Sequence, residues 1–278
     1  ELGDALDTAA SIELMHNAFL VHDDVEDDSE ERRGKPTMHV LHGVPIAVNV
    51  GDALLVLALG PLINNSRRLS PNITLRLLEE AYRMARESVE GQGMELHWRE
   101  DNVIDLVEDD YLELILKKTC WYSIIYPLRA GALIATQDRV DLERFLRFGF
   151  FTGAAFQIQD DLLNLVGDPK RYGKELNGDI QEGKRTLMLI HVLGKASAEE
   201  RGRLHHFLGV PRKARSWSDV MWVRELMDQY GSIGHAQQVA HALVGAALHE
   251  FSQVFADVPP SRDRDFLEAL PRWAIERA

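Results

Sequence analysis

The chain has 278 residues, of which 45% are hydrophobic and 27% are charged. This balance is typical of a soluble globular protein, and the length suits one large helical domain or two small ones. The formal net charge of −13, which no basic tail or stripe offsets, argues against a nucleic-acid partner. The one cysteine, Cys120, excludes an intrachain disulfide and a zinc site made of thiolates. A lone cysteine fits a reducing compartment, and we expect the protein in the cytoplasm.

Helical spacing of apolar residues dominates the sequence, and no stretch alternates convincingly in the way of a strand. Glycine and proline indicate loops over residues 28–45 and 167–184. No linker or composition shift divides the chain, so we expect a single all-α domain over residues 1–278, a helical bundle with a site between its helices. The expected helices cover residues 4–27, 46–64, 72–92, 104–135 with a break near Lys118 and Thr119, 139–166, 185–196, 198–208, 216–230, 232–255 and 262–276.

The stretch over residues 44–63 imitates a membrane span, because Asp52 is its only charged residue. Asn49, Gly60 and Pro61 interrupt it, however, and no cluster of Lys or Arg marks a cytoplasmic side. We therefore expect a buried helix here and a protein that does not span a membrane.

Two acidic motifs stand inside apolar sequence, LVHDDVEDD at residues 20–28 and IQDDLLNLV at residues 158–166. On a helix, positions i and i+4 share a face, so the first and last polar positions of each motif point the same way. Carboxylates this close repel one another, and a hard divalent cation that prefers oxygen ligands would compensate them. The pattern predicts one cleft with metal on both walls, held by Asp23, Asp24, Asp27, Asp160 and Asp161.

Basic residues follow each acidic motif and also occupy a helix between the motifs. Arginine suits bidentate phosphate binding, so this alternation predicts an oligophosphate held by metal on one side and by cations on the other. A glycine-rich phosphate loop ending in Lys-Ser/Thr is absent, so a nucleotide is not favoured. One acidic motif alone is usually solvated surface, but two copies with apolar flanks and basic neighbours favour a site. The basic and polar residues concerned are Arg32, Arg33, Lys117, Lys118, Thr119, Lys174 and Lys184.

Several residues near the motifs keep a structural interpretation beside a functional one. Gln157 either points into the cleft or occupies an ordinary polar helix position. His22 is more often a packed group or a supporting neighbour than a metal ligand. Cys120, Trp121 and Tyr122 are expected to pack in the core, since no basic partner activates the thiol.

Five segments, in this order along the chain, resemble the motifs of the trans (all-E) isoprenyl diphosphate synthases, and are most like those of geranylgeranyl diphosphate synthases. They are HDDVEDDSEERRGKPT, GQGMELHWR, KKTCWYS, FQIQDDLLNL and GKELNGDIQEGKRTL, and the resemblance covers residues 16–191. The combination is specific, whereas any one motif alone is not. The resemblance implies an all-helical fold of the isoprenoid synthase type around a deep central cavity, a homodimer, and about three Mg²⁺ ions that bridge the acidic helices and an allylic diphosphate.

The resemblance also implies a role for each matching residue. The five aspartates named above would hold metal, Arg33 would contact isopentenyl diphosphate, and Gln92 would lie near the metal-bound end. Gln157 would lie beside the reacting carbons. The allylic diphosphate would be held by Arg32, Lys118, Thr119, Lys174 and Lys184. The expected catalytic residues among these are Lys118, Thr119, Gln157 and Lys174.

These roles imply a prenyl transfer. The allylic diphosphate leaves, the double bond of isopentenyl diphosphate attacks the resulting carbocation, and the released diphosphate takes the final proton. Two other functions stay open at this point. One is a terpene cyclase-like enzyme on the same scaffold, and the other is a noncatalytic subunit that regulates a heteromeric synthase.

Two features depart from the family pattern. Asn164 stands where many relatives have Asp, so this position either binds the third metal more weakly or never touches metal. The family also carries a basic Gly-Lys-x-x-Arg stretch that binds isopentenyl diphosphate, and residues 1–22 contain neither Lys nor Arg. We therefore expect that the chain lacks its N-terminal segment.

The helix before Asp23 is expected to determine the length of the product. Ala18 and Phe19 lie one turn before that aspartate, and Met15 lies two turns before it. In the family, a small residue at the Ala18 position goes with products longer than farnesyl diphosphate. The resemblance therefore implies geranylgeranyl diphosphate made from farnesyl diphosphate, with a fifteen-carbon or a twenty-five-carbon product as the alternative.

Overall fold

The computed structural model describes residues 2–167 and 176–277, and this part of the chain is almost entirely helical, which confirms the all-α fold. The long helices are α1 (Leu2–Glu26), α3 (Val44–Asn64), α4 (Pro71–Glu100), α6 (Tyr126–Thr136), α7 (Leu146–Val166), α13 (Ser232–Val254) and α14 (Arg262–Glu276). The shorter helices are α2 (Met38–His42), α5 (Glu108–Ile115), α9 (Gly178–Glu182), α10 (Leu187–Lys195), α11 (Ala198–Gly209) and α12 (Trp217–Gln229). The remaining elements are the 3₁₀ turns η1 (Asn65–Arg67), η3 (Leu142–Phe145) and η4 (Arg212–Ala214), the π-helix η2 (Leu116–Ile125), and the antiparallel pair β1 (Glu31–Arg32) and β2 (Lys35–Pro36).

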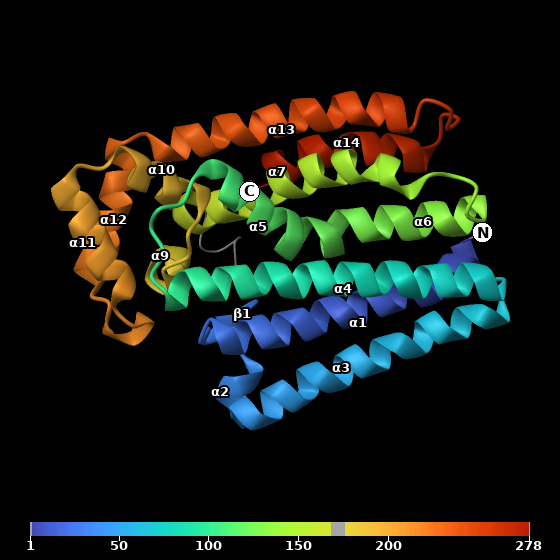
Figure 1. Cartoon of the computed structure of the whole chain (residues 1–278), viewed down its shortest axis with the longest axis horizontal. Helices are drawn as coiled ribbons and strands as arrows, with labels where there is room; N and C mark the ends of the chain where they lie inside the picture. The colour runs from blue at the N-terminus through green and yellow to red at the C-terminus, as the bar shows by residue number, and fades with distance from the viewer. Residues whose placement is uncertain (1, 168–175, 278) are drawn as a thin grey trace.

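The long helices run side by side along the long axis of the molecule, and α10, α11 and α12 gather at one end (Figure 1). α7 lies in the middle and packs against α13, η2 and α14. Phe148, Ile158 and Leu162 of α7 are buried in the core. A helix that buries side chains on several faces has to be enclosed by its neighbours. Enclosure of α7 places the second acidic motif on an inner wall of the bundle.

Glycines let η2 approach two neighbouring helices closely. A Cβ atom on Gly91 of α4 would overlap the backbone nitrogen of Lys118, and one on Gly153 of α7 would lie 2.8 Å from Sγ of Cys120. The predicted break near Lys118 and Thr119 is instead a π-helix, η2, which connects α5 to α6. Such wide turns are rare and are frequently found at functional sites.

Both predicted loops contain short regular elements. Residues 28–45 form the β1–β2 pair and α2, and residues 167–184 contain α9. The helix expected over residues 72–92 begins earlier, because Ser70 is its cap and accepts a hydrogen bond from the backbone nitrogen of Ile73 at 3.3 Å. The earlier start of α4 shows that a side-chain cap can outweigh the apolar pattern at the end of a helix.

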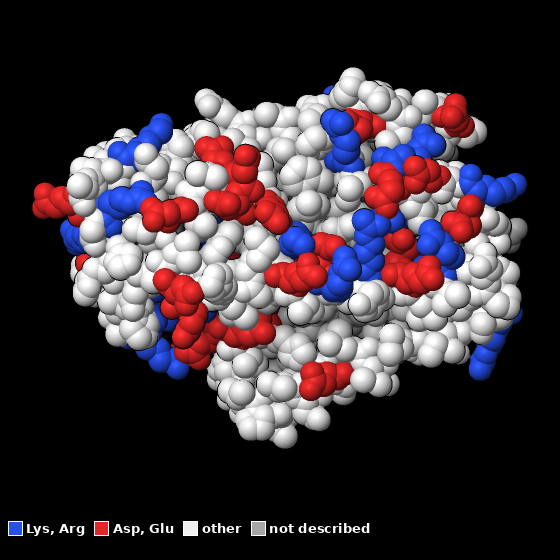
Figure 2. Space-filling view, in the orientation of Figure 1, with Lys and Arg blue, Asp and Glu red and all other residues white. Residues whose placement is uncertain are grey.

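The apolar segment over residues 44–63 forms α3, but α3 is not the buried helix that the sequence predicts. It packs on α1 through Ala47, Gly51, Ala58 and Leu62, and only 22% of its most apolar window is buried. Its length and composition alone would allow it to cross a membrane, which for one helix is weak evidence. In Figure 2 the lower margin, where α3 lies, shows few charged side chains. Apolar side chains of α3 therefore lie on its exposed faces as well as on the face that packs on α1.

We expect Gly91→Ala to destabilise the fold by about 1–3 kcal/mol, because the added methyl group overlaps backbone of η2 that has to shift. Gly93→Ala on the same helix is the matched control, because nothing lies within 4 Å of its added Cβ atom. The control should stabilise α4 by about 0.5–1 kcal/mol through helix propensity. Urea unfolding followed by circular dichroism measures both effects. A Gly91→Ala protein as stable as the unmodified chain would contradict the close packing of η2 on α4.

Candidate active site

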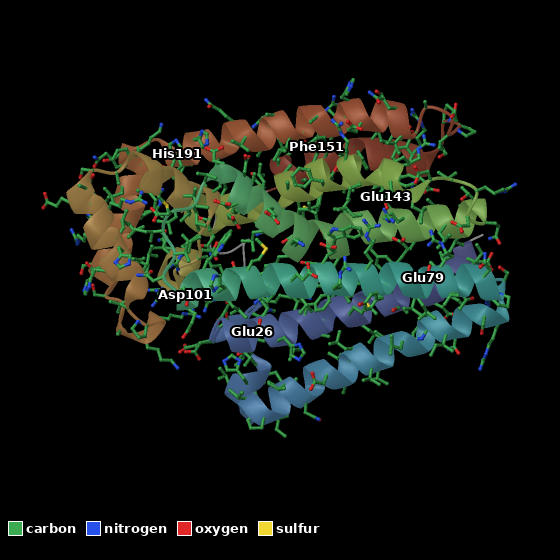
Figure 3. The ribbon with its side chains drawn as sticks, in the orientation of Figure 1. Glu26, Glu79, Asp101, Glu143, Phe151 and His191 are labelled. Atoms are coloured by element: carbon green, nitrogen blue, oxygen red, sulfur yellow. The ribbon has the colours of Figure 1, made fainter. Side chains whose placement is uncertain are left out.

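One large cavity, of about 920 Å³, lies between α1, α4, η2 and α7. It is near the upper end of the usual range for ligand pockets, about 300–1,000 Å³. Glu26 at the end of α1 and Asp101 at the end of α4 lie towards the same end of the bundle (Figure 3). The apolar side chains of the cavity wall include Phe19, Leu20, Leu55, Leu96, Leu114, Ile115 and Phe156. The charged side chains of the wall include Asp23, Glu26, Arg32, Arg33, Glu95, Lys118, Asp160, Lys184 and Arg277.

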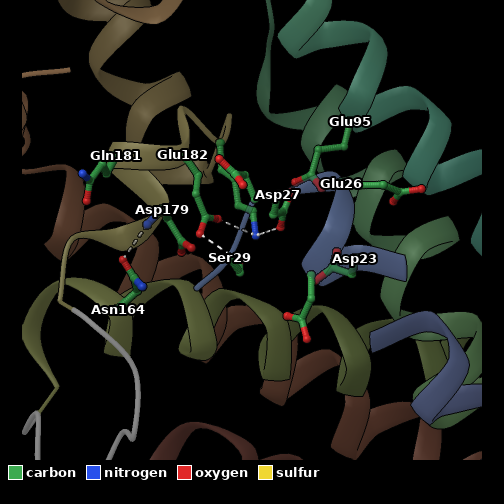
Figure 4. Close-up of polar contacts among 12 residues, drawn as sticks. Asp23, Glu26, Asp27, Ser29, Glu95, Asn164, Asp179, Gln181 and Glu182 are labelled. Atoms are coloured by element: carbon green, nitrogen blue, oxygen red, sulfur yellow. Dashed lines mark hydrogen bonds and ion pairs between the residues drawn. The ribbon is translucent and has the colours of Figure 1, made fainter. Parts of the chain in front are cut away.

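Three carboxylates converge where α1 ends beside α4. Asp23, Asp27 and Glu95 each offer an oxygen atom, and these atoms lie within 4.8 Å of one another. Figure 4 shows the three side chains close together. The carboxylates lie beside the C-terminus of α1, whose dipole adds to their mutual repulsion. A set of three carboxylate oxygens fits a hard divalent cation such as Mg²⁺.

Cations from distant segments pair with these carboxylates. Lys118 of η2 lies 3.2 Å from Asp23 and also contacts Glu95. Lys184 lies 2.8 Å from Asp27, and Arg99 of α4 pairs with the same aspartate. The acidic cluster and the basic residues predicted from different motifs are therefore direct neighbours.

These pairs determine the charge of the buried groups. Burial alone would raise the pKa of Asp23, but the positive charges of Lys118, Lys184 and Arg32 outweigh it and hold that pKa well below its usual range. Burial would lower the pKa of Lys118, but Asp23 and Glu95 outweigh it and raise that pKa above its usual range. The carboxylates and ammonium groups therefore face one another as charged species at neutral pH.

The three polar residues of the second motif have different partners. Asp160 lines the cavity and lies 2.5 Å from Arg277. Asp161 accepts hydrogen bonds from Tyr111 at 2.8 Å and from Gln157 at 2.7 Å. Asn164 accepts a hydrogen bond from the backbone nitrogen of Asp179 at 3.1 Å, which holds the start of α9 (Figure 4). Asp160 is therefore the residue of this motif best placed to reach a metal ion.

Burial raises the pKa of Asp161 to about 6, and the hydrogen bonds from Tyr111 and Gln157 oppose that rise. Both Asp161 oxygens already have partners, which leaves less room for a metal ion at this carboxylate. Asp24 of the first motif is similarly engaged, because it is buried and accepts a hydrogen bond from Nε of Arg32 at 2.7 Å. The metal roles predicted for Asp24 and Asp161 stay predictions.

The structure brings most of the predicted site residues to one cavity. Lys174 lies outside the described residues. Phe19 lines the cavity, whereas Ala18 and Met15 are buried in the core away from its wall, so the predicted influence of these two on product length would have to act through packing. The predicted substrate-binding residues that line the cavity are Arg32, Arg33, Gln92, Lys118, Thr119, Gln157 and Lys184, and the predicted metal residues that do so are Asp23, Asp160 and Asp161.

The cavity also contains residues that the sequence analysis did not select. Glu95 follows Gln92 by three positions, so helical spacing on α4 could have indicated it. Tyr122 was expected in the core, but it lines the cavity and its ring lies 5.4 Å from that of His16 and 6.0 Å from that of Phe19. Tyr111 and Arg277 carried no local signal in the sequence, because their partners lie on other helices.

We expect Asp27→Asn to weaken Mg²⁺ binding at least about tenfold, because it removes one of three clustered carboxylates and keeps the side-chain size. Titration calorimetry with Mg²⁺ and inorganic pyrophosphate measures the change, and circular dichroism checks the fold. Asp28→Asn is the matched control, because the Asp28 side chain is half-buried, lies outside the carboxylate cluster and pairs with Lys213 at 2.7 Å. Equal Mg²⁺ affinity in the two variants would contradict the metal assignment.

The comparisons with known proteins agree with this arrangement. The polyprenyl synthetase family profile matches residues 1–227. A short chain isoprenyl diphosphate synthase of Methanothermobacter thermautotrophicus is 36% identical over 279 aligned positions, which cover 99% of this chain and 80% of that protein. A geranylgeranyl diphosphate synthase of Sulfolobus acidocaldarius is 34% identical, over 96% of this chain and 79% of that protein.

A solved structure shares the fold over the whole chain. The geranylgeranyl pyrophosphate synthase of Corynebacterium glutamicum, complexed with isoprenyl diphosphate and magnesium, superimposes with a TM-score of 0.87 and is 29% identical. The match covers 100% of this chain and 80% of that one. With the family profile matched over most of its length and both acidic motifs meeting at one cavity, the chain belongs to the polyprenyl synthetase family.

Proposed function

We propose that the protein is a Mg²⁺-dependent prenyltransferase that condenses isopentenyl diphosphate with an allylic diphosphate, preferably farnesyl diphosphate, to give geranylgeranyl diphosphate. The observation that carries this proposal is the meeting of acids and cations from distant motifs at one cavity with apolar walls. A substrate with a diphosphate head and a hydrocarbon tail suits both parts of such a cavity. The names of the relatives from Methanothermobacter and Sulfolobus support the same reaction class.

Asp23, Asp27 and Glu95 on one wall and Asp160 on another are the residues that would hold the ions, about three by family resemblance. Bound Mg²⁺ would supply positive charge that stabilises the diphosphate as it leaves. Lys118 and Lys184 now pair with carboxylates that ions would neutralise. Their ammonium groups would then be available to bind diphosphate oxygens.

The reaction needs no side-chain base. The C–O bond of the allylic diphosphate breaks and its electron pair leaves with the diphosphate. The double bond of isopentenyl diphosphate then forms the new C–C bond with the allylic cation, and the released diphosphate accepts the proton that the adjacent carbon loses. Apolar residues such as Leu20, Leu55 and Phe156 on the wall exclude the water that would quench the cation.

The assay uses the protein with Mg²⁺, farnesyl diphosphate and labelled isopentenyl diphosphate, and the product length is read by chromatography. We expect label in a linear twenty-carbon diphosphate. Phe19→Ala should shift the product to longer chains, because it removes a ring that narrows the cavity beside Tyr122. Phe266→Ala, an exposed phenylalanine on α14, is the control and should leave the length unchanged.

The other outcomes of this assay contradict the proposal in distinct ways. A volatile hydrocarbon formed from farnesyl diphosphate alone would indicate a cyclase. No turnover by a folded protein would indicate a noncatalytic subunit.

We also propose that a second copy of the chain covers the exposed side of α3, which would make the protein a homodimer. Val56 and Ile63 of α3 are seven residues apart and exposed, as are Leu75, Tyr82 and Val89 of α4. Residues seven apart share a helix face, so each set forms a stripe, and α3 packs against α4. Exposed apolar area of this extent usually marks an interface. Asp52 on α3, whose side chain is exposed, favours a protein partner over a bilayer.

We expect Val56→Asp to convert a dimer into monomers, raising the dimer dissociation constant at least about tenfold by burying a charge at the contact. Light scattering coupled to size exclusion measures the mass. Phe266→Asp, which changes an equally exposed apolar residue on α14, should stay dimeric. A monomeric unmodified protein that binds to lipid vesicles would instead support a membrane contact for α3.

A cytoplasmic location is our further proposal. It is supported by the single cysteine, because Cys120 is free and buried and therefore forms no structural disulfide.

A further inference from the structure

Three hydrogen bonds form a chain from Tyr111 of α5 to Thr119 of η2. Tyr111 Oη donates to Oδ2 of Asp161 at 2.8 Å. Gln157 Nε2 donates to Oδ1 of Asp161 at 2.7 Å, and Thr119 Oγ1 donates to Oε1 of Gln157 at 2.9 Å. All four residues line the cavity, so the chain of bonds forms part of its wall.

Asp161 determines the direction of every bond in this chain. A carboxylate only accepts hydrogen bonds, so the amide group of Gln157 has to turn its NH₂ towards Asp161. The amide oxygen then faces Thr119, and the hydroxyl proton of Thr119 points at that oxygen. Because its proton is used, the Thr119 hydroxyl can offer a ligand only its lone pairs. The wall of the cavity therefore presents oxygen lone pairs here and no hydroxyl proton.

Tyr111 is the last donor in this chain of hydrogen bonds, at the end opposite Thr119. Tyr111 and Asp161 are 2% and 7% exposed, so water does not supply the donors that the carboxylate needs. With Tyr111 on one oxygen and Gln157 on the other, each oxygen of Asp161 has one fixed partner. Loss of either donor would let the carboxylate rotate and would release the amide.

We propose that Tyr111 is a positioning residue that acts through Asp161 to hold the Gln157 amide in the orientation that keeps the lone pairs of Thr119 available to the allylic cation. The inference rests on the proposed function, because only a reaction through a carbocation gives the lone pairs a role. Oxygen lone pairs fixed beside a developing positive charge stabilise it, whereas a hydroxyl proton in the same place would repel it. Asp161 orients neighbouring side chains in this arrangement, whereas Asp160, which also lines the cavity, is the carboxylate left to reach a metal ion.

The first test is Tyr111→Phe, which removes one hydroxyl group and keeps the ring. We expect kcat with farnesyl and isopentenyl diphosphates to fall about tenfold, while KM for farnesyl diphosphate changes less than about twofold, because binding at the diphosphate end is untouched. The affinity for Mg²⁺ and pyrophosphate, measured by calorimetry, should not change. Tyr126→Phe is the matched control: Tyr126 is fully buried, and its hydroxyl has no hydrogen-bond partner among the described residues.

The second test is a double-mutant cycle with Asp161→Asn. An asparagine that still accepts from Tyr111 would turn its NH₂ group to Gln157, so the amide would flip and the Thr119 proton would point into the cavity. We expect a larger loss of kcat than in Tyr111→Phe, and adding Tyr111→Phe to Asp161→Asn should cost less than about twofold more. A purely structural role for Tyr111 would make the two losses independent.

The outcomes separate this inference from the proposed function. An unmodified protein that makes no elongated product contradicts the proposed function itself. An active protein in which Tyr111→Phe behaves like Tyr126→Phe overturns the inference alone. Multiplicative losses in the cycle, or weaker Mg²⁺ binding by Asp161→Asn, would also overturn it, the second because Asp161 would then be a metal ligand.

Discussion

The opposition of carboxylates and cations at one end of the cavity is the constraint on which the rest of the site depends. Asp23 and Asp27 lie beside the C-terminus of α1, where the helix dipole disfavours negative charge. Lys118, Lys184 and Arg99 neutralise them from three other segments of the chain. A diphosphate with its metal ions carries both kinds of charge. The metal ions could take the place of the lysine and arginine side chains beside the carboxylates, and the diphosphate could take the place of the carboxylates beside those cations. The pairing without ligand thus keeps the charged side chains close to the positions in which they would bind the ligand.

This charge pairing requires η2 to lie close to α1 and α4, and small residues make that approach possible. Gly91 leaves no room for a side chain between α4 and the backbone at Lys118. The π-helix then places Lys118, Thr119 and Tyr122 on one wall of the cavity. The same π-helix consequently contributes residues to both the polar end and the apolar wall of the cavity. A change in the packing of η2 would therefore affect both the diphosphate end and the hydrocarbon end.

Sequence alone could predict the parts of the site that rest on spacing within one helix. The i, i+4 relation of Asp23 and Asp27 follows from helix geometry, and apolar periodicity identified the long helices. Glu95 and Tyr111 were missed because their roles come from contacts between helices, which no local pattern encodes. α3 was expected to be buried because apolar composition does not distinguish a core helix from one whose apolar side chains stay largely exposed in the single chain. The π-helix was interpreted as a break because the close approach of η2 to Gly91 is a contact between helices, which the local sequence does not show.

Each acidic motif contains two consecutive aspartates, and helix geometry gives them different roles. Consecutive residues on a helix point about 100° apart, so both members of a pair cannot face the same ion. In the first motif Asp23 belongs to the carboxylate cluster, while Asp24 is buried and holds Arg32. In the second motif both aspartates line the cavity, but Asp160 pairs with Arg277 while Asp161 is buried and holds Gln157. Arg32 also contacts Asp23, at 3.2 Å, so it links both aspartates of the first pair. The second aspartate of each pair thus fixes a neighbouring side chain, and the repeated pair can supply a metal ligand and a fixed neighbour from one turn of helix.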